Sequence, residues 1–367
     1  MTRFRFITNL RPRTVSSFEN SGHCPQAWLL STHRLEAETQ ELAHTQREEG
    51  LDLFADNGTK RLIDVAIKRF KAPLKPLQEE IWALRTSLGD GRRIPWPREV
   101  PDDLRRRAAA AAREVENSIE RDLAGESAID VLEEQLRMRP THIIAKEDFT
   151  GACLLGLGLE REITGWRVGY FDVLNRRTLD YWDAVANDPR CSNLKVYATL
   201  SAMDYATARS AAELAAKAGV THVALGFAGI NLDRDFTRVF WLPLRRDLPE
   251  NAPRRYARTT EIALGIRDGY RRAGIRLNAF HALGMGATAQ YPILAAALDW
   301  YTDISVDSTS PLHDAVNDLV FYDETARGDR ITVIEAAERI LNGGTWSFAS
   351  PFCRYLKERF GHDPETA

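Results

Sequence analysis

GIRLNAFHALGMG (Gly274–Gly286) and DWYTDISVDSTSP (Asp299–Pro311) each contain a short apolar stretch that ends in polar or glycine residues. Between them, ATAQYPILAAAL (Ala287–Leu298) has a helical pattern. A strand, a helix and a second strand in this order predict a βαβ unit, whose parallel strands present their functional groups at their carboxyl ends. In this unit those ends carry His281 on the first strand and Asp307 on the second.

Six further runs of the chain have the composition of β-strands. Together with the two strands of the βαβ unit, expected at 276–284 and 302–308, they make eight, and most are separated by helical patterns. Eight such repeats predict an α/β fold of the TIM type, a (β/α)8 barrel. The six runs are Arg3–Asn9, Ala27–Thr32, Leu51–Gly58, Thr141–Asp148, Leu194–Ser201 and Thr221–Phe227.

Two parts of the chain exceed a minimal barrel, although we expect a single domain over residues 1–367. Residues 75–138, approximately, separate the third and fourth strands by far more than a usual connection, and they are strongly helical in pattern. Within this insertion Ser127 and Asp130 are spaced like a capping box. A tail of about residues 312–367 follows the last strand and also has a helical pattern.

Composition limits the possible partners and location. The chain has 367 residues and a formal charge of −3, so a nucleic acid would have to be bound by local basic patches. Apolar runs fall short of the ~20 residues of a membrane span, and charges interrupt the N-terminal stretch, which lacks the apolar core of a signal peptide. The four cysteines are scattered, which argues against disulfides and favours a cytoplasmic location.

Polar and glycine residues follow six of the predicted strands. Carboxylates on three strand ends and glycines on two more predict a small pocket, in which acids serve as nucleophile, proton donor or recognition group. Any single acid could instead cap a turn, but three that converge favour a site. The residues are Asp56, Asn57 and Gly58; Glu147 and Asp148; Ser201; Gly226 and Phe227; His281, Leu283 and Gly284; and Asp307.

Five short motifs resemble the tRNA-guanine transglycosylases, and among them the DNA-acting relatives that install 7-deazaguanines in DNA. LFADNG is similar to the strand of that family that ends in Asp-Ser-Gly-Gly, AKEDFTG to its Asp-Glu-Cys-Thr segment and HVALGFAG to its Gly-Gly-Leu-Ala segment. HALGMG is similar to Leu-Met-Gly-Val-Gly, and DISVDS to the ending Asp-x-Phe-Asp-Ser/Cys. The order and spacing of the motifs, from about Phe4 to Pro311, carry the resemblance.

The resemblance implies a role for each matching residue. Asp307 matches the nucleophile, and Asp56 matches the aspartate implicated as general acid/base. The base-recognising aspartate falls on Glu147 when the segments are aligned on Thr150, whereas residue type favours Asp148. The remaining residues would line the base site, with the Gly226 backbone and Ser201 in polar contact, Phe227 or Leu283 stacking, and Asn57, Gly58, His281 and Gly284 around them.

Some features depart from the family. Its Cys-x-Cys-x-x-Cys…His zinc motif has no counterpart here, where only Cys353, His313 and His362 follow Asp307, so we predict no metal and no cofactor. Thr59 replaces the second glycine of Asp-Ser-Gly-Gly, and Leu200 or Ser201 replaces a glutamine that recognises the base edge. These changes favour DNA over tRNA as the substrate.

The partners implied are a polynucleotide and a free 7-deazaguanine base of the preQ0 type, with protein partners or a homodimer left open and no membrane. Phosphates would be held by Lys60, Arg61, Arg92 and Arg93, although a solvated helix face explains the insertion's arginines as well.

Other readings remain open at this stage. They are a tRNA-guanine transglycosylase or its non-catalytic nucleic-acid-binding subunit, a barrel hydrolase or lyase acting on a small metabolite, and a metal-dependent barrel that uses His281, Asp307 and Asp56.

Overall fold

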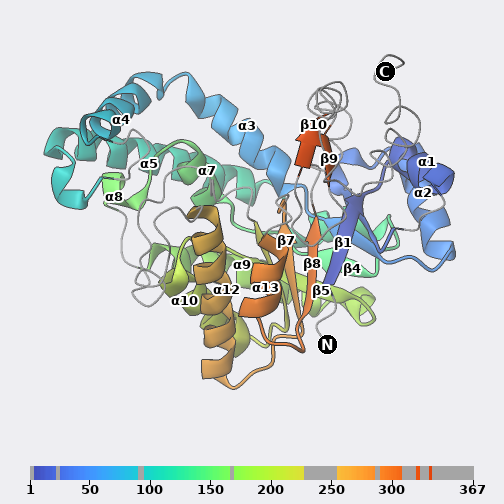
Figure 1. Cartoon of the computed structure of the whole chain (residues 1–367). Coiled ribbons are helices and arrows are strands. Elements are labelled where there is room, and N and C mark those ends of the chain that lie inside the picture. Colours follow the sequence, from blue (N-terminus) through green and yellow to red (C-terminus); the bar gives the residue numbers. More distant parts are fainter. Residues whose placement is uncertain are drawn as a thin grey trace, which may run out of the picture. The chain divides into compact units, whose positions relative to one another are not determined.

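Eight parallel strands close into a barrel in sequence order, with β1 paired to both β2 and β8 (Figure 1). The computed structural model describes residues 4–21, 25–89, 95–165, 169–226, 254–285, 290–307, 320–322 and 330–332. The prediction of a TIM-type (β/α)8 barrel is confirmed, and each predicted run contains the strand observed. The strands are β1 (Phe4–Asn9), β2 (Trp28–Ser31), β3 (Leu53–Asp56), β4 (His142–Ile144), β5 (Lys195–Leu200), β6 (His222–Gly226), β7 (Ala279–Leu283) and β8 (Asp303–Asp307).

Helices connect the strands, as a (β/α)8 barrel requires. They are α1 (Pro12–Ser21), α2 (Ala37–Glu48), α3 (Thr59–Lys71), α4 (Lys75–Ser87), α5 (Asp102–Ala124), α6 (Ala128–Leu136), α7 (Thr150–Gly156), α8 (Arg161–Thr164), α9 (Tyr170–Ala186), α10 (Tyr205–Lys217), α12 (Arg254–Ala273) and α13 (Tyr291–Ala297). The described residues also form three short 3-10 helices, η1 (Thr32–Arg34), η2 (Pro97–Glu99) and η3 (Pro189–Cys191).

The insertion between β3 and β4 is helical, as predicted, and has its own core. One face of α5 buries Leu104, Ala108, Val115 and Ile119 in a cluster with side chains of α3, α4 and α7. The predicted capping box begins α6, where the Ser127 hydroxyl accepts a 3.1 Å hydrogen bond from the amide of Asp130. Helix α3 follows β3 directly and leads into the insertion. Figure 1 shows α3, α4 and α5 extending away from the barrel strands.

The chain divides into two compact units, one of residues 1–285 and 293–307 and the other of residues 286–292 and 308–367. Within the second unit, the described part of the tail consists of β9 (Val320–Tyr322) and β10 (Arg330–Thr332), which pair antiparallel. The helical pattern of the tail did not predict this pair of strands. The rest of the tail lies outside the described residues.

Helices α10 and α12 pack closely because two glycines of α12 face α10. A Cβ atom on Gly265 would lie 2.6 Å from the carbonyl oxygen of Tyr205, and one on Gly269 would lie 2.5 Å from Cβ of Ala212. No side chain fits in either place without a shift of backbone.

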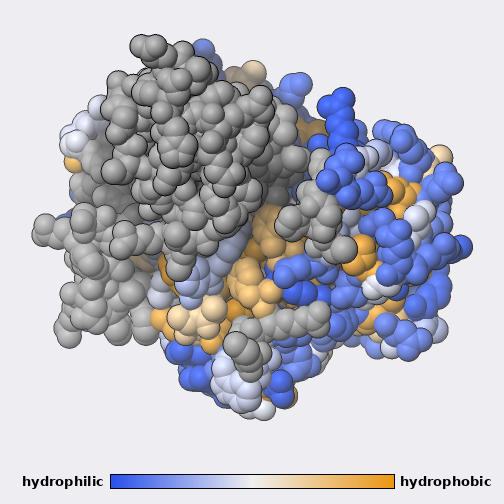
Figure 2. Space-filling model, turned by 45° about the vertical axis from the view of Figure 1, so that its right-hand side comes forward, coloured by the Kyte–Doolittle hydropathy of each residue, from blue (hydrophilic) through white to orange (hydrophobic). Residues whose placement is uncertain are grey.

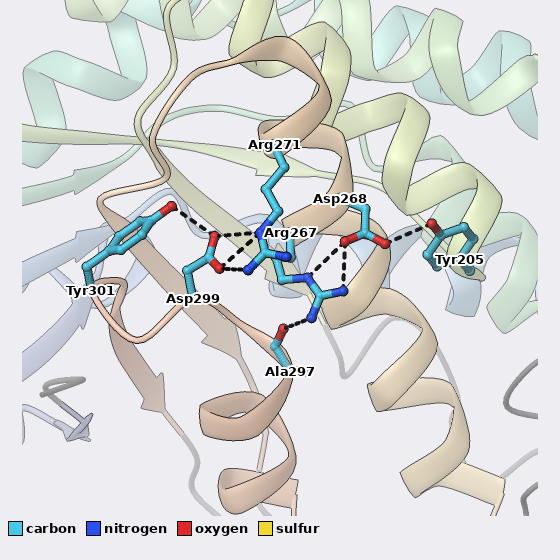
Figure 3. Close-up of polar contacts among 7 residues, drawn as sticks. All are labelled: Tyr205, Arg267, Asp268, Arg271, Ala297, Asp299 and Tyr301. Atoms are coloured by element: carbon cyan, nitrogen blue, oxygen red, sulfur yellow. Dashed lines mark hydrogen bonds and ion pairs between the residues drawn. The ribbon is translucent and has the colours of Figure 1, made fainter.

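A polar network fixes the turn that precedes β8. Asp299 in this turn accepts a 3.1 Å hydrogen bond from Nε of Arg271 on α12 and a 2.9 Å hydrogen bond from the Tyr301 hydroxyl. On the same helix Asp268 accepts a 2.9 Å hydrogen bond from the Tyr205 hydroxyl of α10. These contacts hold in place the strand that carries Asp307. Figure 3 shows the network, formed by Tyr205, Arg267, Asp268, Arg271, Ala297, Asp299 and Tyr301.

Apolar and aromatic side chains fill the barrel interior, including Ile7, Leu29, Phe54, Ile144, Tyr197 and Ala224. Towards the amino ends of the strands the interior also contains polar groups, and we call Arg5, His142, Tyr197 and His222 the barrel floor. Arg5 donates a 2.7 Å hydrogen bond to Asp52. The ring of His142 stacks on Phe54 with 4.0 Å between centroids.

Burial keeps both floor histidines neutral. It lowers the pKa of His142 to about 2 and the pKa of His222 to about 4, and the nearby positive charge of Lys195 adds to both shifts. A buried imidazole resists protonation because the interior solvates its charged form poorly. The two floor histidines are therefore neutral at neutral pH, and Arg5 is the charged group of the floor, paired with Asp52.

Candidate active site

The carboxyl ends of the strands bring Asp56 and Asp307 to the same end of the barrel, which we call the mouth. Asp56 is the last residue of β3 and lies opposite Ser31 of β2, and Asp307 is the last residue of β8, opposite Ile7 of β1. The pKa of Asp56 is raised, mainly by burial and further by the negative charge of Asp307. Hydrogen bonds from the Ser31 hydroxyl and the Gly58 amide oppose the shift. The protonated form of Asp56 is therefore favoured relative to a free aspartate.

The turn after Asp56 is rigid because its polar groups bond to each other and to the next strand. Gly58 adopts a left-handed conformation with φ of 75°, and a Cβ there would lie 2.8 Å from the Thr32 hydroxyl. The Asn57 amide donates a 2.7 Å hydrogen bond to the Ala145 carbonyl, and its oxygen accepts one of 3.0 Å from the amide of Thr59. Asn57 and Gly58, predicted to bind substrate, thus shape the mouth.

Glu147 lies on the Asp56 side of the mouth, in the irregular segment that follows β4. Burial raises the pKa of Glu147 to about 8, and the charge of Asp56 adds to the shift, while hydrogen bonds from the side chains of Asn57 and Thr59 oppose it. At neutral pH Glu147 is therefore mostly a neutral carboxylic acid. An ionised Asp56 therefore favours a proton on Glu147.

Asp148, the next residue, faces away from this pair. Its side chain has no exposed surface. One carboxylate oxygen accepts hydrogen bonds of 2.6 and 2.9 Å from the hydroxyl and amide of Thr150, and the other lies 3.2 Å from Nη1 of Arg177 on α9. Arg177 also donates a 2.5 Å hydrogen bond to Glu120 of α5, which joins the insertion to the segment carrying Glu147. Of the two alternatives left open by the sequence, Glu147 is the one placed beside Asp56.

On the opposite side of the mouth, Asp307 is bonded to β7. Its Oδ1 accepts a 3.0 Å hydrogen bond from the amide of Gly284, which has φ of 69°. The same oxygen lies 3.3 Å from Nε2 of His281. The other ring nitrogen of His281, Nδ1, lies 2.9 Å from the hydroxyl of Ser305 on β8. His281 is fully buried, so it belongs to the wall beneath the mouth.

The remaining predicted residues lie around these two groups of acids. Both backbone groups of Ser201 are bonded to the side chain of Asn175, at 2.8 and 2.9 Å. Gly226 ends β6 opposite Leu283 of β7, and Leu283 packs on the interior cluster of the barrel. A Cβ on Gly226 would meet no described atom within 4 Å. Phe227 lies outside the described residues.

The predicted basic residues lie beside the mouth or outside the described part. Lys60 and Arg61 begin α3 and are exposed. Lys60 forms an ion pair with Asp64 one turn further on. Arg92 and Arg93 are not among the described residues.

Within the described ranges, no group of three or more His, Cys, Asp or Glu side chains is arranged to hold a metal ion. Cys353, His313 and His362, the residues weighed against the zinc motif, lie outside those ranges. Of the four cysteines, Cys153 and Cys191 are described, and both are buried free thiols.

Three residues near the acids were missed by the sequence analysis. Ser31 and Ser305 are strand residues, and Arg177 lies on helix α9. Ser305 had a usable signal, because it lies two residues before Asp307 and alternate residues of a strand share a face.

Comparisons with known proteins give no family for this chain. No protein-family model and no curated protein matches it. Among solved structures, an HpcH/HpaI aldolase from Desulfitobacterium hafniense superposes with a TM-score of 0.34 and 9% sequence identity, covering 84% of this chain and 89% of that one. This similarity is too low to carry an argument about what the chain does. In the described part of the chain, no helix combines the length and apolar character needed to cross a membrane.

Proposed function

We propose that the chain is a base-exchange glycosyltransferase that replaces guanine in a polynucleotide, with DNA favoured over tRNA, by a 7-deazaguanine. The observation that carries the proposal is the contrast between the two aspartates at one mouth. Burial and the negative charge of Asp307 raise the pKa of Asp56, whereas Oδ1 of Asp307 accepts a hydrogen bond from the Gly284 amide. Covalent glycosyl transfer needs an ionised nucleophile and a proton donor facing one another.

In the first step, an oxygen of Asp307 would form a bond to C1′ of the target nucleoside. The C1′–N9 bond breaks, its electron pair passes to guanine, and the proton of Asp56 passes to the departing base. The raised pKa of Asp56 supports this donor role, because it favours the protonated form more than in a free aspartate. The product is an ester between Asp307 and the sugar of the polymer.

In the second step, N9 of the incoming 7-deazaguanine would attack C1′ and break the bond to Asp307. The N9 proton returns to Asp56, so the enzyme ends in its starting state. Two displacements at one carbon retain configuration, as in retaining glycosidases.

Glu147 would recognise the base by accepting hydrogen bonds from its ring N–H and its exocyclic amine. That role requires the ionised carboxylate, whereas the ligand-free pKa of about 8 favours the neutral acid at pH 7. Base binding is then coupled to loss of a proton from Glu147, and the ionised fraction limits the apparent affinity.

The polymer's phosphates would contact the exposed side of α3, which begins three residues after Asp56. Arg61, Lys68 and Lys71 on this helix are exposed and form no ion pair with any other described residue. Leu62 and Val65, at 41% and 49% exposure, lie among them. Figure 2 shows one face of the molecule, where hydrophilic side chains surround smaller groups of apolar ones.

The test is incorporation of radiolabelled guanine by the purified protein into duplex DNA, single-stranded DNA and tRNA. Incorporation into DNA alone would support the proposal in full, and incorporation into tRNA alone would move the substrate to tRNA. Binding of either polymer without exchange would indicate a non-catalytic subunit. The target base must leave its stack, so we expect single-stranded DNA to react at least as fast as duplex.

A second candidate is a barrel hydrolase or lyase acting on a small metabolite. The observation that favours it is the Asp56–Glu147 pair, since two acids of raised pKa can move protons on a small substrate without any polymer. No exchange in any of the three polymers, together with no polymer binding, would select this candidate.

A further inference from the structure

His281 and Ser305 are buried beneath Asp307, and the proposed exchange assigns them no task. His281 has 0% exposure and Ser305 has 2%. The Nε2 atom of His281 has no hydrogen-bond partner of good geometry among the described residues, although it points at Oδ1 of Asp307 from 3.3 Å. A buried polar atom without a partner needs an explanation, and here the carboxylate lies next to it.

The contacts determine which nitrogen of His281 bears the hydrogen. A carboxylate only accepts, so a lone pair on Nε2 facing Oδ1 would be repelled, whereas an N–H there is attracted. In the neutral ring Nδ1 is then an acceptor, and the Ser305 hydroxyl, 2.9 Å away, must donate to it. Ser305 thereby selects the Nε2–H tautomer, in the way that a hydrogen bond at one ring nitrogen sets the state of the other.

Two N–H groups then converge on a single oxygen of Asp307. Oδ1 accepts a 3.0 Å hydrogen bond from the Gly284 amide, and Nε2 of His281 lies 3.3 Å from the same oxygen. Among the residues the structure describes, none donates to Oδ2. We infer that Ser305 and His281 are positioning residues that assign Oδ1 to the protein and leave Oδ2 as the oxygen that reacts. This inference rests on the proposed function for its chemical meaning but not for its geometry.

The arrangement has a kinetic consequence in the proposed exchange. When Oδ2 bonds to C1′, Asp307 loses its negative charge, and when the incoming base breaks that bond the charge returns. Donors on Oδ1 stabilise the returning carboxylate, as preorganised donors stabilise charge that develops in a transition state. Hydrogen bonds of this kind are often long before substrate binds and shorten in the complex. Loss of the His281 donor should therefore slow the second step more than the first.

The first experiment uses the ligand-free protein and needs no activity. Long-range proton–nitrogen NMR on protein carrying 15N-labelled histidine distinguishes the two neutral tautomers, and the His281 signal is identified by its absence from His281→Gln. We expect Nε2–H in the wild type and a mixture of tautomers in Ser305→Ala. Thr199→Val is the matched control, because it removes another buried hydroxyl of the barrel, one without a described partner. An Nδ1–H ring in the wild type, or no effect of Ser305→Ala, would overturn the inference.

The second experiment compares two replacements of His281. Glutamine places an amide N–H near the position of Nε2, whereas asparagine reaches only to the position of Nδ1. We expect His281→Asn to lose exchange on the order of 10²-fold and to accumulate the covalent protein–oligonucleotide adduct on a denaturing gel. His281→Gln should recover most of the rate without the adduct. Equal losses in both variants with no adduct would refute the positioning role.

The two experiments also separate this inference from the proposed function. If the wild type exchanges no base into any polymer, the transglycosylase proposal fails, and the NMR result still decides whether Ser305 and His281 orient Asp307. If exchange occurs but the wrong tautomer is found, the reaction stands and the positioning role falls.

Discussion

Burial shifts the pKa values of titratable groups at both the mouth and the floor of the barrel, but in opposite directions. At the floor, burial lowers the pKa values of His142 and His222, and both rings stay neutral over the whole neutral range. At the mouth, burial and the charge of Asp307 raise the pKa of Asp56, and burial and the charge of Asp56 raise the pKa of Glu147 to about 8. The floor histidines titrate only in acid, whereas Glu147 at the mouth titrates near pH 8.

The difference shows what the two ends can do. The floor groups pack against aromatic rings inside the barrel, so changes there should alter stability and leave the chemistry alone. The mouth groups lie at strand ends next to turns and can exchange protons with a ligand. Substitutions of the same type at the two ends of one strand therefore test the division directly.

The largest effect is expected for Asp307→Asn at the mouth end of β8. Loss of the nucleophile should reduce guanine exchange by about 10⁴-fold or more, with an unchanged circular dichroism spectrum. Asp303→Asn, on the same strand and face but at its amino end, is the matched control and should keep exchange activity. Substantial exchange by Asp307→Asn would remove that residue from the nucleophile role.

The next largest effect is expected for Asp56→Asn at the carboxyl end of β3. Asp52→Asn, just before the amino end of the same strand, is the variant for comparison. Without its proton donor, exchange should fall by 10²- to 10⁴-fold, as is typical of lost general acid catalysis. The charge of Asp56 also contributes to the raised pKa of Glu147, so that pKa should fall below about 8 in Asp56→Asn. Carbon-13 NMR titration of glutamate-labelled protein measures it. An unchanged Glu147 pKa would mean that the two acids are not coupled.

Base binding should depend on pH through Glu147. The pKa of Glu147 is about 8, so at lower pH the side chain is mostly protonated and cannot accept both base hydrogens. The Kd for a free 7-deazaguanine should therefore fall by up to ~10-fold per pH unit as the pH rises from 6 to 8, and then level off. Calorimetric titrations across this range test it. Glu147→Gln should bind more weakly than the wild type at pH 8 and show no such slope, and a slope retained in that variant would assign the proton elsewhere.

Acid should destabilise the floor. His142 and His222 are neutral in the folded protein but protonate near pH 6.5 when unfolded, so their folded pKa values are lowered and stability is lost as pH falls below about 6.5. Each can lower the free energy of unfolding by at most ~1.4 kcal/mol per pH unit. Denaturant unfolding at pH 7, 6 and 5 would show this loss, and His142→Phe should flatten it. Identical pH dependence in that variant would exclude His142 as a cause.

The smallest effect is expected on α3, outside both ends of the barrel. Arg61→Ala should raise the Kd for single-stranded DNA a few-fold and reduce the slope of log Kd against log salt by about one unit. Binding of the free base should not change. Lys75→Ala, which removes a lysine that pairs with Glu79 at the start of α4, serves as the charge-matched control. Equal effects of the two variants would show that only overall charge matters.

The sequence predicted well what depends on short-range pattern. All eight strands, the helical insertion and the Ser127–Asp130 capping box follow from apolar runs, helical periodicity and cap spacing, which act over a few residues. The acids at the ends of β3 and β8 were located for the same reason, because a strand that ends in aspartate places it at the mouth of any parallel barrel.

Other features could not be predicted because they depend on pairing between distant segments. The choice between Glu147 and Asp148 was open, since the irregular segment after β4 follows no period. The hydrogen bonds of Asp148 with Thr150 and with Arg177 on α9 show where Asp148 points. The contact of His281 with Ser305 depends on the register of β7 against β8. The short strands β9 and β10 have too few residues to stand out from a helical background.

The closure of the barrel between β1 and β8 also sets the order of events during synthesis. Phe4 pairs with Ile304, about 300 residues later in the chain, so the first strand to leave the ribosome waits longest for its second neighbour. At 5–20 residues per second the wait is roughly 15–60 s. Asp307 lies on β8, the strand whose synthesis ends this wait. The nascent protein therefore completes its ring and receives its proposed nucleophile in the same event, and any chain released early has neither.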